Sequence, residues 1–67
     1  MNHEQVNRIL AEAPERSKIV SLNDGKEVRI QSRERYLAGP VMLIVLDDDG
    51  DYVYVSYRNI ASIRTAS

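Results

Sequence analysis

The chain of 67 residues has no cysteine, tryptophan or phenylalanine, and His3 is its one histidine. The lack of cysteine excludes disulfides and thiolate metal sites and agrees with a reducing cytoplasm. A single histidine excludes a site built from several histidines of one chain. We therefore expect neither a metal nor a cofactor.

Long apolar runs are absent as well, since none approaches the ~20 residues that span a bilayer. The first residues are polar, without the apolar segment of a signal peptide. We expect a cytoplasmic protein with no membrane contact. The net charge of −1 provides no basic field to attract nucleic acid, so a polyanion would need a local patch.

The short length predicts a single domain over residues 1–67. A chain of this size buries only about 60% of the surface that its unfolded form exposes, so its stability is marginal without help. With disulfides and metals excluded, oligomerisation is the expected source of added stability. A monomer that folds alone is the alternative.

Residues 2–13 are predicted to form a helix. Asn2 is a suitable N-cap, with Gln5 as its capping-box partner, and Pro14 ends the helical pattern. A helix of three turns is not stable alone in water, so its apolar stripe must dock on the rest of the chain. The stripe consists of Val6, Ile9, Leu10 and Ala13.

Five short strands joined by tight turns are predicted after the helix, with antiparallel pairing. Residues 41–46 are apolar without a break, so this strand is apolar on both faces and must be covered on both. A strongly bent sheet closing into a small SH3-like or OB-like barrel meets that demand, with the helix against one open side. The strands cover residues 17–22, 27–32, 40–46, 52–56 and 60–64.

Residues 47–51 are acidic and could suggest a cation site. EF-hand spacing fails, because Val45 and Ser56 hold the first and twelfth ligand positions. We interpret the segment as a solvated hairpin tip that discourages edge-to-edge aggregation. No nucleophile motif, phosphate-binding glycine loop or catalytic carboxylate pair is found either, so we expect no enzyme.

Three segments resemble signatures of the Sm-like, or Hfq-like, family. Residues 20–26 resemble the first strand and its Asp-Gly turn, residues 42–47 the third strand, and residues 55–63 the second signature. The resemblance implies an N-terminal helix followed by five bent strands. The chain departs from the family at Gln31, where the family has a bend-forming glycine, and at the uridine-recognition positions.

The resemblance also implies a homo-oligomeric ring, formed when the fourth strand of one subunit pairs with the fifth of the next. We predict a ring that binds single-stranded RNA in a regulatory or RNA-chaperone role, with bases stacking on tyrosine and arginine on phosphate. The predicted RNA-binding residues are Arg35, Tyr36, Tyr57, Arg58 and Asn59. The predicted subunit interface consists of Val53, Val55, Ser62 and Ile63.

A second hypothesis keeps the small barrel but gives it no nucleic acid. In this hypothesis the chain is a self-association or protein-interaction module, which the acidic balance favours. Tyr36 and Tyr57 would then be half-buried barrel residues, and the arginines would be solvated.

Overall fold

The computed structural model describes residues 1–66 and contains one α-helix, two 3-10 turns and six strands. The helix is α1 (His3–Ala11), and the 3-10 turns are η1 (Arg33–Arg35) and η2 (Tyr57–Asn59). The strands are β1 (Lys18–Leu22), β2 (Glu27–Ile30), β3 (Tyr36–Ala38), β4 (Met42–Leu46), β5 (Tyr52–Ser56) and β6 (Ile60–Thr65).

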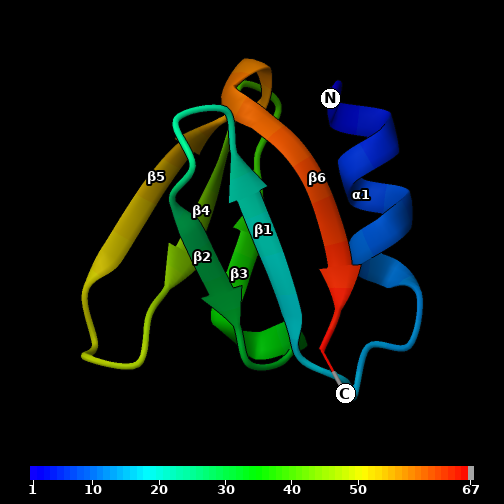
Figure 1. The fold of residues 1–67 in the computed structure, drawn as a ribbon. Helices are drawn as coiled ribbons and strands as arrows, with labels where there is room; N and C mark the ends of the chain where they lie inside the picture. The colour runs from blue at the N-terminus through cyan, green and yellow to red at the C-terminus, as the bar shows by residue number, and fades with distance from the viewer. Residues whose placement is uncertain (67) are drawn as a thin grey trace.

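The strands form two antiparallel sheets of three, in the orders β2-β1-β6 and β3-β4-β5. The core lies between the sheets, and α1 stands beside β6 at one side of the molecule (Figure 1). Within residues 1–66, no strand of one sheet is hydrogen-bonded to a strand of the other. The mainly β class with an N-terminal helix and antiparallel pairing is therefore confirmed.

The predicted number of five strands is wrong, because a sixth strand, β3, lies between the expected strands 27–32 and 40–46. The expected strand 27–32 ends at Ile30, η1 follows, and the chain then enters the second sheet. Three residues are too few to show an alternating pattern in the sequence. The strand β3 forms because it pairs with β4, with Tyr36 opposite Val45. The expected strand 40–46 begins at Met42, since Gly39 and Met42 close the preceding turn by a 3.0 Å backbone hydrogen bond. The other three strands agree with the prediction to within one residue.

The helix begins as predicted. Asn2 Oδ1 accepts the Gln5 N–H at 2.8 Å, and Gln5 Oε1 accepts the Asn2 N–H at 3.0 Å, which completes the capping box. The expected end at residue 13 is wrong, because the helix stops at Ala11 and Ala13 has φ +46°. Pro14 disfavours helical geometry at the residue before it, and here the chain has already left the helix at Glu12.

The core is built from alternate strand positions and one face of the helix. Val6 and Leu10 of α1 are fully buried, whereas Ile9 and Ala13 of the predicted stripe are half-buried. The strands and η2 supply the remaining buried apolar side chains. These are Val20, Ile30, Leu43, Val45, Val55, Tyr57 and Ile60.

One polar side chain is buried with the core. Lys18 is 3% exposed, and its Nζ donates a 3.0 Å hydrogen bond to the Ala13 carbonyl. The ammonium therefore has a backbone partner in the turn between α1 and β1. No carboxylate pairs with it within residues 1–66.

The expectation that residues 41–46 are covered on both faces is wrong. Leu43 and Val45 point into the core, but Met42, Ile44 and Leu46 lie on the other face of the β3-β4-β5 sheet and are only half-buried. No element of the described chain packs over that face. Neighbouring side chains on β3 and β5 shield these residues in part, and this shielding replaces the predicted cover.

Candidate interaction surface

The β3-β4-β5 sheet turns a row of apolar and aromatic side chains outward. Directly opposed residues of antiparallel strands share a face. Leu37 opposes Ile44, which opposes Tyr54, and Leu46 opposes Tyr52. We call this surface the outer face. It consists of Leu37, Met42, Ile44, Leu46, Tyr52 and Tyr54.

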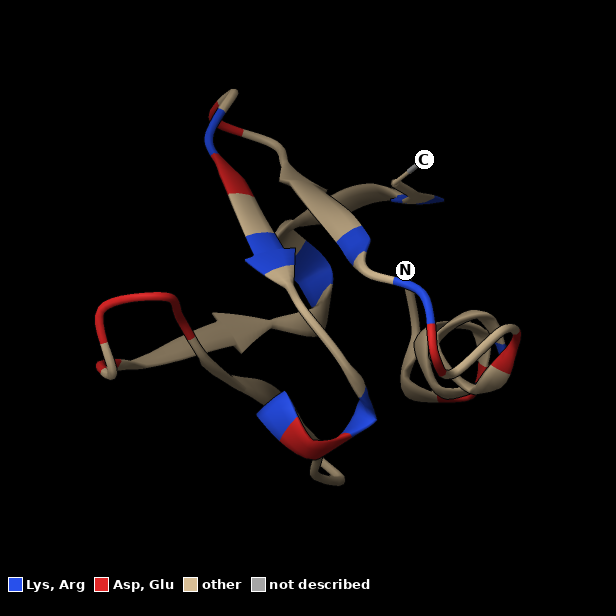
Figure 2. Ribbon diagram, turned by 90° about the horizontal axis from the view of Figure 1, so that it is seen from below, with Lys and Arg blue, Asp and Glu red and all other residues tan. Residues whose placement is uncertain are grey.

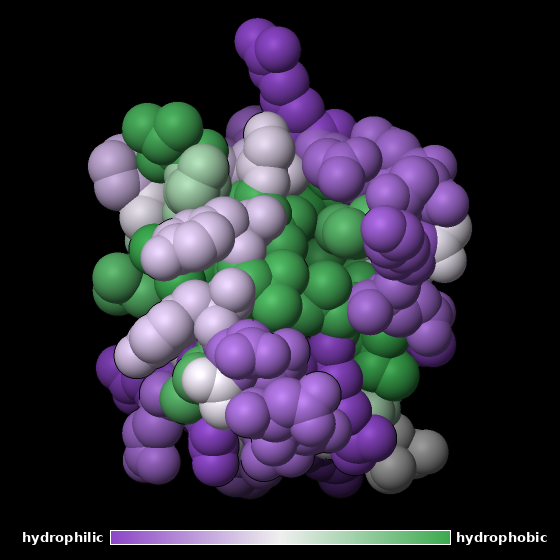
Figure 3. Space-filling model, turned by 90° about the vertical axis from the view of Figure 1, so that its left-hand side faces the viewer, coloured by the Kyte–Doolittle hydropathy of each residue, from purple (hydrophilic) through white to green (hydrophobic). Residues whose placement is uncertain are grey.

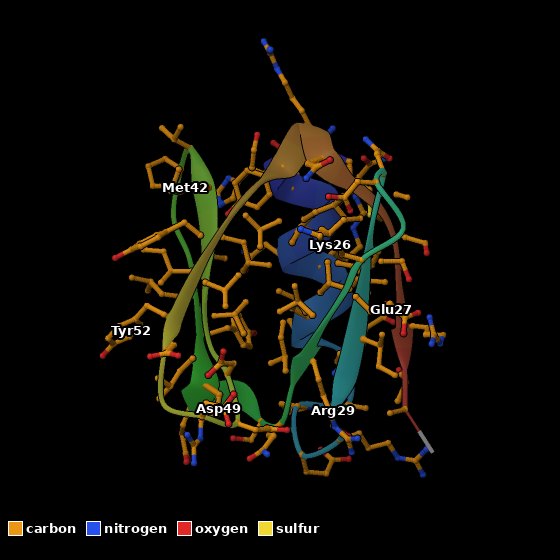
Figure 4. The ribbon with its side chains drawn as sticks, turned by 60° about the vertical axis from the view of Figure 1, so that its left-hand side comes forward. Lys26, Glu27, Arg29, Met42, Asp49 and Tyr52 are labelled. Carbon is orange, nitrogen blue, oxygen red and sulfur yellow. The ribbon has the colours of Figure 1, made fainter. Side chains whose placement is uncertain are left out.

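The outer face is exposed at its two margins. Leu37 on β3 is 64% exposed, and Tyr52 and Tyr54 on β5 are 66% and 64% exposed. Figure 4 shows Met42 and Tyr52 on the side of the sheet that is turned away from α1. Isolated exposed apolar residues are ordinary, but adjoining ones on a single sheet face are typical of an interaction surface.

The same face is hollowed into a groove of about 320 Å³. The groove has an aliphatic floor from β4, a tyrosine wall from β5 and Leu37 on the β3 side, and it reaches the 3-10 turn η1 at one end. It is lined by Glu34, Arg35, Tyr36, Leu37, Ile44, Leu46, Tyr52 and Tyr54. Figure 3 looks at the molecule from the left of Figure 1, so the outer face lies along its left margin, and the apolar surface in its middle lies between the two sheets.

Opposite charges lie at two corners of one end of the outer face. The acidic loop (residues 47–51) joins β4 to β5, and η1, with Arg33 and Arg35, precedes β3. Both lie at the same end because Tyr36 pairs with Val45 and Leu46 pairs with Tyr52. Seen from below, the two segments occupy separate corners (Figure 2).

The acidic loop is held by its own hydrogen bonds. Asp47 Oδ1 accepts the N–H groups of Asp49 at 3.0 Å and Asp51 at 2.9 Å, and Asp48 accepts a hydrogen bond from Gln31 Nε2. Gly50 has φ +85°, which a residue with a side chain adopts only with strain. None of the four carboxylates forms an ion pair within residues 1–66. The loop therefore presents negative charge in a fixed conformation.

A second, more polar groove of about 220 Å³ lies on the other side of the acidic loop, against β2. Glu27, Val28, Arg29 and residues 47–49 line it. Glu27 is already engaged there, since its carboxylate pairs with Arg64 at 3.1 Å. This groove is smaller and lacks an exposed aromatic wall.

The predicted RNA-binding residues are not brought together. Arg35 and Tyr36 lie at the acidic-loop end of the β3-β4-β5 sheet, whereas Tyr57, Arg58 and Asn59 form η2 beyond the other end, where Ser56 pairs with Met42.

Both tyrosines of that prediction make contacts inside the protein. Tyr57 is 6% exposed, its hydroxyl donates to the Gly39 carbonyl, and its ring centroid lies 5.4 Å from that of His3. Burial raises the pKa of the Tyr57 hydroxyl. Tyr36 is half-buried, and its hydroxyl donates to the Leu10 carbonyl at 3.4 Å. Neither ring offers an open stacking face of the kind that Tyr52 and Tyr54 present.

The backbone of η2 is tied to the turn between β1 and β2. The Asn59 carbonyl accepts the Asn23 N–H at 2.8 Å, and the Arg58 carbonyl accepts Asn23 Nδ2 at 3.0 Å. The Arg58 side chain is exposed, and Asn59 is half-buried. These contacts hold η2 in position and leave the Arg58 side chain exposed.

The predicted subunit-interface residues point mostly inward. Val55 is 3% exposed and belongs to the core, Val53 and Ile63 are half-buried against it, and Ser62 is exposed. β5 and β6 are outer strands of different sheets, each paired on one side within residues 1–66. A ring contact through these strands would therefore use backbone edges more than these side chains.

The sequence-based prediction misses the outer face because it places residues 52–55 in a strand that pairs with the next subunit of a ring. Their alternation carried the signal, since in Tyr-Val-Tyr-Val the valines of a strand point to one side and the tyrosines to the other. Valines turned toward the core require tyrosines turned toward solvent.

Within residues 1–66, no group of three potential ligands among His, Asp and Glu is placed to hold a metal ion. The one helix of the described chain has nine residues, too few to cross a bilayer. No family model, curated protein or solved structure matches the chain.

Proposed function

We propose that this chain is a protein-interaction module whose binding surface is the outer face of the β3-β4-β5 sheet. The observation that carries the proposal is the exposure of Leu37, Tyr52 and Tyr54 along one groove. Fully burying a large apolar side chain contributes about 1.5–3 kcal/mol, so a partner that covers these three gains several kcal/mol before the cost of association. Tyrosine also suits an interface, because its ring is apolar and its hydroxyl remains able to hydrogen-bond.

We also propose that the two sheets represent an SH3-like or Sm-like small barrel in its open form. The chain passes from one sheet to the other between β2 and β3, and a 3-10 turn precedes the last strand. Both features support a bent continuous sheet in which η1 interrupts one long strand. A cytoplasmic location remains a prediction from the lack of cysteine.

A second candidate is the Sm-like ring that binds single-stranded RNA. It is supported by the free edges of β5 and β6, through which copies could pair head to tail. The engaged rings of Tyr36 and Tyr57 and the acidic loop count against it. This candidate predicts RNA binding that weakens with salt and depends on Arg35 and Arg58.

The two candidates are separated by their ligands. The purified chain is used to select peptides from a random displayed library and is also titrated with labelled oligo-U and oligo-A at low salt. We expect peptide ligands whose binding is lost in Leu37→Glu and Tyr54→Glu and retained in Ser62→Glu, which places the same charge at an exposed position of the other sheet. Salt-dependent RNA binding without any peptide ligand would overturn the proposal in favour of the ring.

A further inference from the structure

We propose that the occupant of the outer face is a second copy of this chain, held in a two-fold dimer with the two outer faces stacked. This inference rests on the proposed function and names its partner. The places of the charged residues and of the large and small side chains on this sheet favour such a dimer. They also select the direction of the two-fold axis.

The two-fold axis lies between the stacked β3-β4-β5 sheets of the two copies and runs parallel to their strands. Such a rotation keeps the ends of the two sheets aligned and places β3 of one copy over β5 of the other. The corner with Arg33 and Arg35 then faces the acidic loop of the second copy, and the same contact repeats on the other side of the axis, as an isologous interface requires. Glu34 reduces the net charge of η1 to +1, against −4 for the loop, so the paired corners remain opposite in sign.

The free carboxylates suit this contact. Asp49 and Asp51 are exposed, and neither forms an ion pair within residues 1–66. Arg33 is exposed as well, and Arg35 lines the end of the groove. Long arginine side chains can reach across an interface and bind carboxylates in a bidentate geometry.

A two-fold axis that lies in the same plane but runs across the strands gives a less favourable dimer. It stacks β5 on β5 with the ends exchanged, so the acidic loop faces Arg58 and η1 faces the turn at Gly39 and Pro40. One arginine then meets the loop in place of two, and the arginines of η1 meet no carboxylate. Complementary charge therefore favours the axis along the strands.

Side-chain sizes agree with the same axis. The row Leu37, Ile44, Tyr54 has its middle member on the central strand. An axis through this row packs Ile44 on its own counterpart and sets Leu37 against Tyr54 of the second copy, twice. A branched aliphatic side chain opposite an aromatic ring fills space better than two facing tyrosines.

The size of the face predicts a weak dimer. The molecule measures 24 × 24 × 21 Å, so one face projects an area on the order of 500 Å². Two such faces bury roughly 1,000 Å², which is near the lower limit for specific interfaces. We therefore expect a dimer that dissociates on dilution and, because charge contributes, on addition of salt.

The test uses sedimentation equilibrium over a range of protein and salt concentrations. We expect twice the chain mass at high protein and low salt for the wild type and for the control Arg58→Glu. Two doubly substituted chains should each remain monomeric: Arg33→Glu with Arg35→Glu, and Asp49→Lys with Asp51→Lys. Mixing these two chains in equal amounts should restore the dimer, because at one corner the introduced glutamates face the introduced lysines, while the other corner keeps its original arginines and aspartates. Circular dichroism and thermal unfolding check that every variant is folded.

Other outcomes overturn the proposal in distinguishable ways. If Arg58→Glu lost the dimer while Arg33→Glu with Arg35→Glu kept it, the two-fold axis would run across the strands and the proposed axis would be wrong. A mass above two copies would show edge pairing into a ring. A monomer at all concentrations that still binds selected peptides through Leu37 would remove the dimer and leave the proposed function in place. A monomer that binds no peptide would remove both.

Discussion

Replacing Tyr57 with phenylalanine removes one hydroxyl from a buried position and leaves the ring in place. That hydroxyl donates to the Gly39 carbonyl and joins η2 to the turn before β4. A hydrogen bond of this kind contributes about 0.5–1.5 kcal/mol net, and leaving the carbonyl without its partner costs about 1–3 kcal/mol where water cannot replace the donor. We expect Tyr57→Phe to lower the free energy of unfolding by about 1–2 kcal/mol, a loss of roughly 4–16 °C in Tm for a domain of this size.

Urea unfolding at pH 7 measures this effect, with Tyr54→Phe as the matched control. The Tyr54 side chain is exposed on the outer face, so the same change there should alter the unfolding free energy by less than about 0.5 kcal/mol in the monomeric protein. Equal losses in the two variants would refute the argument that the Tyr57 contact stabilises the fold.

The same tyrosine predicts a pH dependence. Burial raises the pKa of Tyr57, so the folded protein holds this proton more tightly than the unfolded chain does. The corresponding stabilisation is complete below about pH 10, the pKa of an unfolded tyrosine, and is lost as the pH rises through the folded pKa. The unfolding free energy of the wild type should therefore fall more steeply above pH 10 than that of Tyr57→Phe. Parallel curves for the two proteins would contradict the predicted direction of the shift.

Three further substitutions test the local structure, each by urea unfolding. Asn2→Ala removes the helix cap and should cost about 1 kcal/mol, whereas Asn7→Ala in the exposed middle of α1 should be neutral or stabilising; equal effects would exclude a role for the cap. Lys18→Glu places an unmatched carboxylate beside the Ala13 carbonyl and should cost at least about 3 kcal/mol, against less than about 0.5 kcal/mol for the exposed Lys26→Glu. Gly25→Ala should cost about 1 kcal/mol from backbone strain alone, since its φ is +92° and nothing lies within 4 Å of an added Cβ. A neutral Gly25→Ala would mean that the turn relaxes to another conformation.

Several parts of the fold could be predicted because they depend on neighbours in sequence. The capping box needs only Asn2 and Gln5 at the correct spacing. The turn at Gly25 needs only a residue that tolerates positive φ. The alternation of Val53 and Val55 with Tyr52 and Tyr54 requires opposite faces on any strand.

The candidate site could not be predicted in the same way, because it depends on which strand lies next to which. Leu37 belongs to no apolar pattern in the sequence. It joins the groove only because β3 pairs with β4, which sets Leu37 opposite Ile44. Tyr57 looked available for stacking, but its ring is buried beside His3 and its hydroxyl is bonded to Gly39.

The sequence by itself determined the local conformations of this protein: where the helix begins, where the chain turns, and which residues of each strand share a side. These follow from short-range sterics and hydrogen bonding, which act between residues a few positions apart. Only the tertiary structure decided which of two apolar faces of β4 became core. Both faces were hydrophobic enough, and the face bearing Leu43 and Val45 became core because the second sheet and α1 cover it. The face bearing Ile44 stayed on the outside, and it belongs to the surface that we propose binds a partner.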